Sequence, residues 1–98
     1  MKFVDTDSLK KLAKANEERL AKAKDRLINN PCKENYSNYL FAYSYQTIII
    51  GFLATPLKKR ECYIKQLISS SLVKNEEADR QARRQFIIDV TDCKLLEE

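Results

Sequence analysis

The stretch from residue 36 to residue 54, YSNYLFAYSYQTIIIGFLA, constrains the fold of this chain more than any other part of it. Read at helical spacing, the stretch is apolar on two sides. One side carries Tyr36, Tyr39, Leu40, Tyr43 and Ile50, and the other carries Phe41, Tyr45, Ile48 and Phe52. A helix that is apolar nearly all round is typically buried. The pattern therefore predicts a central helix that other segments of the chain cover.

Another helix is predicted before it, from residue 6 or 7 to residue 28. Its start offers the capping side chains of Asp5, Thr6 and Asp7. Small and apolar residues at steps of three and four form a narrow seam: Ala13, Asn16, Leu20, Ala23 and Leu27. The other faces are densely charged, and Glu18 and Lys22 have the spacing of a supporting ion pair. We expect this helix to cover the central one; a partner protein or a second copy of the chain is the alternative occupant of the seam.

Two prolines set the remaining boundaries. Asn30 is predicted to cap the central helix with Pro31 at its first position, and that helix then runs to about residue 53. Thr55 as cap and Pro56 as first residue repeat the device and predict a third helix. Asn75 is expected to cap a fourth. The apolar set of the third helix is Leu57, Ile64, Leu67, Ile68, Leu72 and Val73.

The predicted fold class is all-α: a small bundle of about four helices around the central aromatic helix, in a single domain of residues 1–98. With one Gly and two Pro, turn formers are too scarce for a sandwich or barrel of many short strands. Residues 86–91 are rich in β-branched side chains and also fit a strand. A lone strand has no partner, so a helix is preferred there.

The residue types argue against catalysis. The chain has no histidine, which removes the commonest general base and every Ser–His or Cys–His nucleophile pair. A single glycine excludes a Gly-rich phosphate loop. The carboxylate pairs Glu17–Glu18 and Glu76–Glu77 are sequence neighbours, which point about 100° apart on a helix and do not converge on one substrate. We therefore expect no enzyme, no catalytic residue and no cofactor.

Cysteine usage and hydropathy bear on the compartment. Cys32, Cys62 and Cys93 form no CxxC pair, which favours reduced, small buried side chains in a cytosolic protein. No metal site is expected, because no histidine completes a set of four ligands. Residues 1–5 show no apolar signal region. Residues 39–54 are only 16 in number and include polar side chains, whereas a membrane span needs roughly 20 mostly apolar residues. A cytoplasmic protein without a membrane segment is predicted.

Two basic clusters are the first candidate binding residues: Lys58, Lys59 and Arg60, and then Arg80, Arg83 and Arg84. If the third and fourth helices are antiparallel neighbours, their ends bring both clusters near one surface. Solvated helix surface, a protein partner and nucleic acid all remain open for these residues. The interleaved acidic residues and a pI of about 9.0 do not favour nucleic acid.

The tyrosines and one proline are the other candidates. Tyrosine is enriched among interface anchors, so some of the five tyrosines are candidates for a contact surface. The alternative is that they pack the core with their hydroxyl groups at its rim. Tyr63 is the tyrosine placed among the partner-binding candidates. The Thr55–Pro56 bond is a candidate site for a prolyl isomerase, although Pro56 also fits a simple helix start.

Taken whole, the chain resembles the anti-RecBCD accessory proteins of lambdoid phages of Salmonella. The likeness lies in the opening MKFVDTDSLKKLAKANEERL, the centre YLFAYSYQTIIIGFLATPLKKREC and the ending LLEE, with length, mass and basic all-helical make-up. It implies a non-enzymatic host-takeover protein that binds the bacterial RecBCD helicase-nuclease through RecC. Altered processing of DNA ends and an altered Chi response would then favour phage recombination.

Two other classes stay open beside this one. One is a bacteriocin immunity protein, which is also a small basic helical bundle. The other is a small nucleic-acid-binding regulator, whose binding would weaken steeply with salt. The resemblance carries over no binding residue by motif, so the candidate residues above come from the chain itself.

Overall fold

The computed structural model describes residues 5–70 and 77–91. Its elements are α1 (Thr6–Asn29), α2 (Lys33–Ala54), a short 3-10 helix η1 (Leu57–Lys59), α3 (Arg60–Ser70) and α4 (Glu77–Thr91). Within these residues there is no strand, and the predicted all-α bundle around an aromatic-rich helix is confirmed. Residues 86–91 are helical, as preferred. The predicted cap Asn75 lies outside the described residues, as do Leu72 and Val73.

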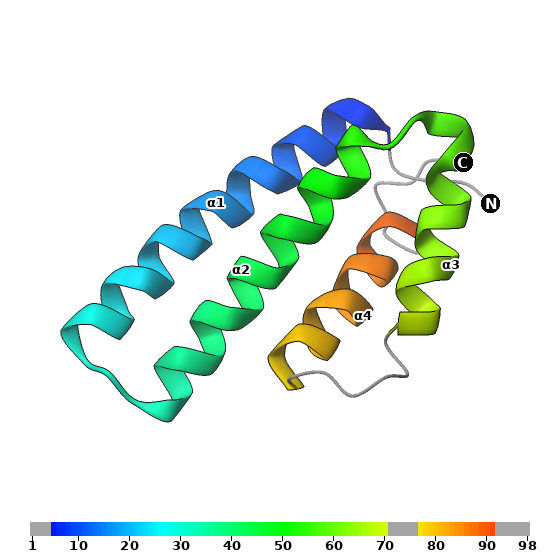
Figure 1. Cartoon of the computed structure of the whole chain (residues 1–98). Coiled ribbons are helices and arrows are strands. Elements are labelled where there is room, and N and C mark those ends of the chain that lie inside the picture. Colours follow the sequence, from blue (N-terminus) through cyan, green and yellow to red (C-terminus); the bar gives the residue numbers. More distant parts are fainter. Residues whose placement is uncertain (1–4, 71–76, 92–98) are drawn as a thin grey trace.

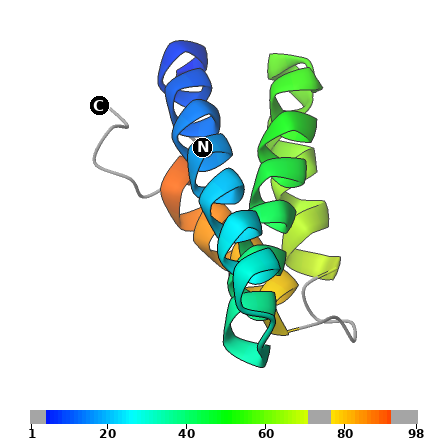
Figure 2. The same ribbon diagram turned by 90° about the vertical axis from the view of Figure 1, so that its left-hand side faces the viewer.

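Helix α2 is the element against which the other long helices pack. Helices α1 and α2 form an antiparallel hairpin (Figure 1). Helix α4 lies along α2 in the same direction, and α3 runs back beside α4 (Figures 1 and 2). One hydrophobic cluster joins all four helices: Leu9, Tyr45, Ile48, Ile49, Phe52, Ile64, Leu67, Ala82, Phe86 and Val90. Phe52 and Phe86 meet edge-to-face at its centre, with ring centroids 5.2 Å apart.

The narrow seam of α1 packs on α2 and not on another molecule. Asp5 caps the helix, its carboxylate accepting the backbone N–H of Ser8 at 2.7 Å. That hydrogen bond is the main reason why the pKa of Asp5 lies below its usual value. Further along the seam, the buried Asn16 donates from Nδ2 to the carbonyl oxygen of Ala42 at 3.0 Å and to Oε1 of Gln46 at 2.9 Å. The covering role predicted for α1 is confirmed.

The connection between α1 and α2 differs from the prediction. Asn30 ends α1, since its backbone N–H bonds the carbonyl oxygen of Arg26 at 2.8 Å. The N-cap of α2 is Cys32, so placing Asn30 and Pro31 at the start of α2 was wrong. The amide of Asn35 reaches back and donates to the carbonyl oxygens of Arg26 and Asn30. Asn30 thus bonds a carbonyl oxygen of α1, the helix before it, and Pro31 lies in the connection between α1 and α2.

The connection between α2 and α3 shows the same shift. The Thr55 hydroxyl donates back to the carbonyl oxygen of Gly51 at 2.8 Å, and Thr55 ends α2. Pro56 is extended and precedes η1 instead of opening α3, so the predicted cap and first residue of the third helix were wrong. Arg60 is 4% exposed and closes this corner: its guanidinium donates to the carbonyl oxygens of Leu53 and Thr55 and lies 5.0 Å from the ring centroid of Phe52. Carbonyls at a helix end need such donors.

The only glycine of the chain marks a close contact. The Tyr63 hydroxyl donates to the carbonyl oxygen of Ile48 at 3.1 Å, directly over Gly51. A Cβ at position 51 would lie 2.7 Å from that hydroxyl oxygen. Gly51 therefore allows the hydroxyl end of Tyr63 to approach α2 closely, with the ring edge-to-face with Phe52.

Candidate functional site

One face of α2 is apolar but uncovered, which we call the tyrosine face: Tyr36, Tyr43 and Ile50. These side chains are 51%, 52% and 55% exposed. They recur every seven residues, so they lie on one side of the helix. The ring of Tyr39, half-buried, leans toward Tyr43 with a centroid distance of 6.0 Å. The prediction that α2 is covered all round was wrong on this side, because α1, α3 and α4 contact its other sides, at Ala42, Ile48 and Tyr45 respectively.

The first basic cluster divides between surface and interior. Lys58 and Lys59 are exposed in η1, next to Leu57, which is also exposed. Arg60 is buried and its donors are used at the end of α2. The expectation that Arg60 shares a surface with the two lysines was therefore wrong. Its role in this structure is to close a helix terminus.

The second basic cluster lies on α4 and is mostly paired within that helix. Arg80 bonds Glu77 at 2.6 Å, and Arg83 bonds Asp79 at 2.9 Å. The bond from Arg80, with a second one from Gln81, lowers the pKa of the Glu77 carboxyl. Arg84 is exposed.

The two basic clusters do not form one surface. The start of α4 lies beside the N-terminal half of α2, where Ala78 and Asn38 line one hollow, whereas Lys58 follows the C-terminus of α2. Arg83 acts on Tyr63 of α3 through its charge: burial raises the pKa of the Tyr63 phenol, and the positive charge of Arg83 opposes that shift. Helices α3 and α4 are antiparallel neighbours, which was the condition for the two clusters to share a surface, but their basic ends lie apart (Figure 1).

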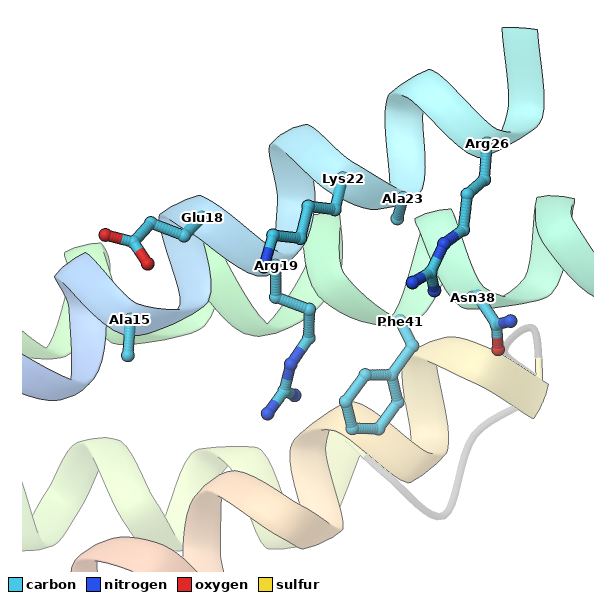
Figure 3. Close-up of a pocket in the computed structure, with 8 residues that line it drawn as sticks. All are labelled: Ala15, Glu18, Arg19, Lys22, Ala23, Arg26, Asn38 and Phe41. Carbon is cyan, nitrogen blue, oxygen red and sulfur yellow. The ribbon is translucent and has the colours of Figure 1, made fainter. Parts of the chain in front are cut away.

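A groove that sequence reasoning missed lies between α1 and α4, which we call the α1–α4 groove. Its largest hollow is about 460 Å³ and is lined by α1 and α2: Arg19 and Arg26 project into it from α1 beside Phe41 of α2, and Lys22 runs along α1 at its edge (Figure 3). The other residues that line this hollow are Ala15, Glu18, Ala23 and Asn38. Glu18 points away from Lys22, so the predicted ion pair is not formed (Figure 3). The spacing of Arg19, Lys22 and Arg26, at steps of three and four residues, was the sequence signal for this row of cations. It could not be recognised because α1 carries charges on every outer face.

The cysteines differ from their prediction. Cys32 and Cys62 are free thiols and both are exposed, so they do not serve as buried apolar residues; Cys93 lies outside the described residues. Cys62 borders a hollow beside Pro56, which is exposed at the turn. Among residues 5–70 and 77–91, no cluster of cysteines and carboxylates has the make-up of a metal site.

Comparisons with known proteins leave the chain without a match. No protein-family model matches it, and neither the curated proteins nor the solved structures include a match. Over the residues that the structure describes, none of the helices combines the length and apolar character needed to cross a bilayer.

Proposed function

We propose that this protein is a non-enzymatic binding module that docks on a larger protein through the tyrosine face of α2. The supporting observation is that three large apolar side chains, Tyr36, Tyr43 and Ile50, stay more than half exposed on one side of the most apolar helix. Tyrosine supplies a large contact area at a small entropy cost and is enriched among the residues that dominate binding energy. A rigid helix also loses little freedom on binding.

The partner we propose is the RecBCD helicase-nuclease in the cytoplasm of a bacterial host, contacted through RecC. The resemblance to anti-RecBCD accessory proteins of lambdoid phages supports this choice. Bound there, the module changes the handling of DNA ends and the response to Chi, so that phage recombination uses those ends. Lys58 and Lys59, exposed beside the C-terminus of α2, favour encounter with an acidic surface. Contact with DNA is secondary in this proposal.

The first test is retention of purified RecBCD on the immobilised protein at moderate salt after nuclease treatment. We expect the three subunits to be retained. The variant Tyr43→Ser/Ile50→Ser should weaken the complex by about 2 kcal/mol or more, roughly 30-fold in Kd, as expected for a central anchor. The matched control is Ile28→Ser/Ile88→Ser, which removes two exposed isoleucines, 65% and 45% exposed, from α1 and α4.

Each other outcome overturns part of the proposal. Equal weakening by both double variants would show that the tyrosine face is not the contact. No retained subunit would exclude RecBCD. In that case binding to nucleic acid that is lost in salt would support the regulator class, and protection of cells from one bacteriocin would support the immunity class. A concentration-dependent dimer that the Tyr43→Ser/Ile50→Ser variant abolishes would assign the face to a second copy of the chain.

A second proposed partner is a host prolyl isomerase that acts at Pro56, which is exposed at the turn after α2. Retention of an isomerase from a host lysate by the wild type, and its loss with Pro56→Ala, is the expected result. Retention that is unchanged in Pro56→Ala contradicts the assignment.

A further inference from the structure

The two walls of the α1–α4 groove differ in how their charges are satisfied. On the α4 wall, Asp89 accepts hydrogen bonds from the Tyr45 hydroxyl at 2.6 Å and from the Gln85 amide at 2.8 Å. Glu77, at the other end of that wall, is paired with Arg80. Both carboxylates are thus neutralised or held by neighbours within the protein.

The α1 wall carries charge without such partners. Arg19, Lys22 and Arg26 are exposed, and within residues 5–70 and 77–91 none of them forms an ion pair. Their spacing of three and four residues places them along one line of the helix. The wall therefore carries a row of three positive charges without ion-pair partners among the described residues; Arg19 and Arg26 point into the groove, and Lys22 runs along α1 at its edge (Figure 3).

The groove is long, and its floor is aromatic. Hollows of about 460, 360 and 390 Å³ meet at Phe41, which lines all three. The first two lie along α1 from Leu12 to Arg26, which corresponds to about 21 Å of helix, and the third lies between α2 and the start of α4. A site of that length suits a segment of several turns and not a single small anion. The half-buried ring of Phe41 and the methyl groups of Ala15 and Ala23 suit apolar side chains.

A buried atom beside the same groove lacks a partner. Asn16 lines the hollow of about 360 Å³ and is 3% exposed. Both of its hydrogen bonds to α2 use Nδ2, and its Oδ1 has no donor. Buried acceptors are nearly always satisfied in folded proteins. Oδ1 has less than 1 Å² of accessible surface, so it lies beneath the hollow and is not itself a contact for a ligand.

We propose that the α1–α4 groove binds an acidic amphipathic helix of the partner protein. The inference rests on the proposed function, because it states which part of a protein partner this second surface takes. The helix lays its apolar side chains over Phe41 and pairs its carboxylates with Arg19, Lys22 and Arg26. A nucleic acid fits less well, since the half-buried ring of Phe41 and the methyl group of Ala15 lie beside the cations, and apolar side chains cover them better than a sugar-phosphate backbone does.

The test uses the full chain and three probes. A fluorescent synthetic helical peptide of about 14 residues carries leucines on one face and flanking glutamates. A poly-glutamate of equal length carries the charge without the apolar face, and a single-stranded oligonucleotide carries phosphates. The groove variant is Arg19→Glu/Lys22→Glu/Arg26→Glu. Its matched control, Lys10→Glu/Lys14→Glu/Lys24→Glu, reverses three exposed charges on the same helix outside the groove.

We expect the amphipathic peptide to bind the wild type and the control triple variant, and to bind the groove variant at least tenfold more weakly, on the order of what three lost and reversed ion pairs give. Thermal unfolding followed by circular dichroism checks that both variants fold. Phe41→Ser, which keeps every charge, should also weaken the peptide.

Three results would overturn the inference: equal weakening by both triple variants, poly-glutamate binding as tightly as the amphipathic peptide, or displacement of the peptide by the oligonucleotide. RecBCD retention is measured with the same variants. If RecBCD is retained while no probe binds the groove, the inference about the groove fails and the proposed function stands. If the peptide binds and RecBCD does not, the partner is wrong and the groove stands.

Discussion

The two faces of α2 are built from the same residue types and have opposite surroundings. Tyr45 and Phe52 are 2% and 0% exposed, and the rings of both meet Phe86 of α4. Tyr43 and Ile50, two residues before each of them, are 52% and 55% exposed. A step of two residues turns about 200° round a helix, so these side chains point almost oppositely. The same composition therefore stabilises the fold on one side and remains available for contact on the other.

The largest difference between the faces should appear on truncation. Phe52→Ala is expected to cost about 3–5 kcal/mol, because a fully buried ring is lost and a cavity is left. Against a total stability of about 5–15 kcal/mol, this brings the protein near unfolding. Tyr43→Ala should change stability by only about 0.5 kcal/mol. Urea unfolding followed by circular dichroism measures both, and similar costs for the two would show that the tyrosine face is covered in solution.

Removing single hydroxyl groups from Tyr45 and Tyr43 compares the two faces with a smaller change. Tyr45→Phe removes the 2.6 Å hydrogen bond to the Asp89 carboxylate, and we expect a loss of about 1.5–3 kcal/mol. Tyr43→Phe, on the exposed side, should leave the free energy of unfolding unchanged. A neutral result for Tyr45→Phe would mean that water replaces the phenol at Asp89 without loss.

Sequence periodicity was sufficient to predict where the helices lie in the chain, but not which face of each helix is buried. Charged outer faces and an apolar centre specify a helical bundle, and α2 was correctly placed as its centre. Apolar residues on all sides of α2 concealed which side stays exposed, because periodicity ranks faces only when one of them is polar. The cap assignments failed for a related reason: Asn30 and Thr55 can satisfy the helix before them or the helix after them, and the local pattern does not decide between the two.

The candidate site was less predictable than the fold. Runs of like charge identified Lys58 and Lys59 correctly as exposed cations. They also suggested Arg60, whose burial depends on carbonyl groups at the end of α2. The α1–α4 groove depends on how far apart two helices lie, a property of tertiary packing that no spacing within α1 expresses. Arg19, Lys22 and Arg26 were therefore indistinguishable from the other cations of α1.

Gly51 lies on the edge of α2 between its two faces, and its substitution should have a smaller effect on stability. The effect is measured in the wild type and in the Tyr63→Phe variant. In the wild type, Gly51→Ala pushes the Tyr63 hydroxyl from its place and sacrifices its bond to Ile48, which offsets the better helix propensity of alanine. In the Tyr63→Phe background the obstructing oxygen is gone, so the same change should stabilise the protein by up to about 1 kcal/mol. A double-mutant cycle measures the coupling. Additive effects would contradict the close contact.

The smallest predicted effect is a dependence on alkaline pH. Burial raises the pKa of Tyr63 in the folded protein above its ordinary value of 10.0, so the folded state holds this proton more tightly than the unfolded state. The resulting stability is fully present below the unfolded pKa and is lost as pH rises through the folded pKa. Melting temperature should therefore fall more steeply above about pH 10 in the wild type than in Tyr63→Phe. Parallel curves would indicate that the phenol ionises equally in both states.

The hydrogen bonds of Asn16 bear on how the chain finds a single arrangement. The seam of α1 is made largely of alanine and leucine at regular intervals, so sliding it by two turns along α2 would present a closely similar apolar surface. The amide of Asn16 meets Ala42 and Gln46 in one alignment only. A buried polar residue in a repeating seam commonly selects one register at a cost in stability. In this hairpin Asn16 fixes the register of α1 on α2. That register also sets how far Arg19, Lys22 and Arg26 lie from Phe41.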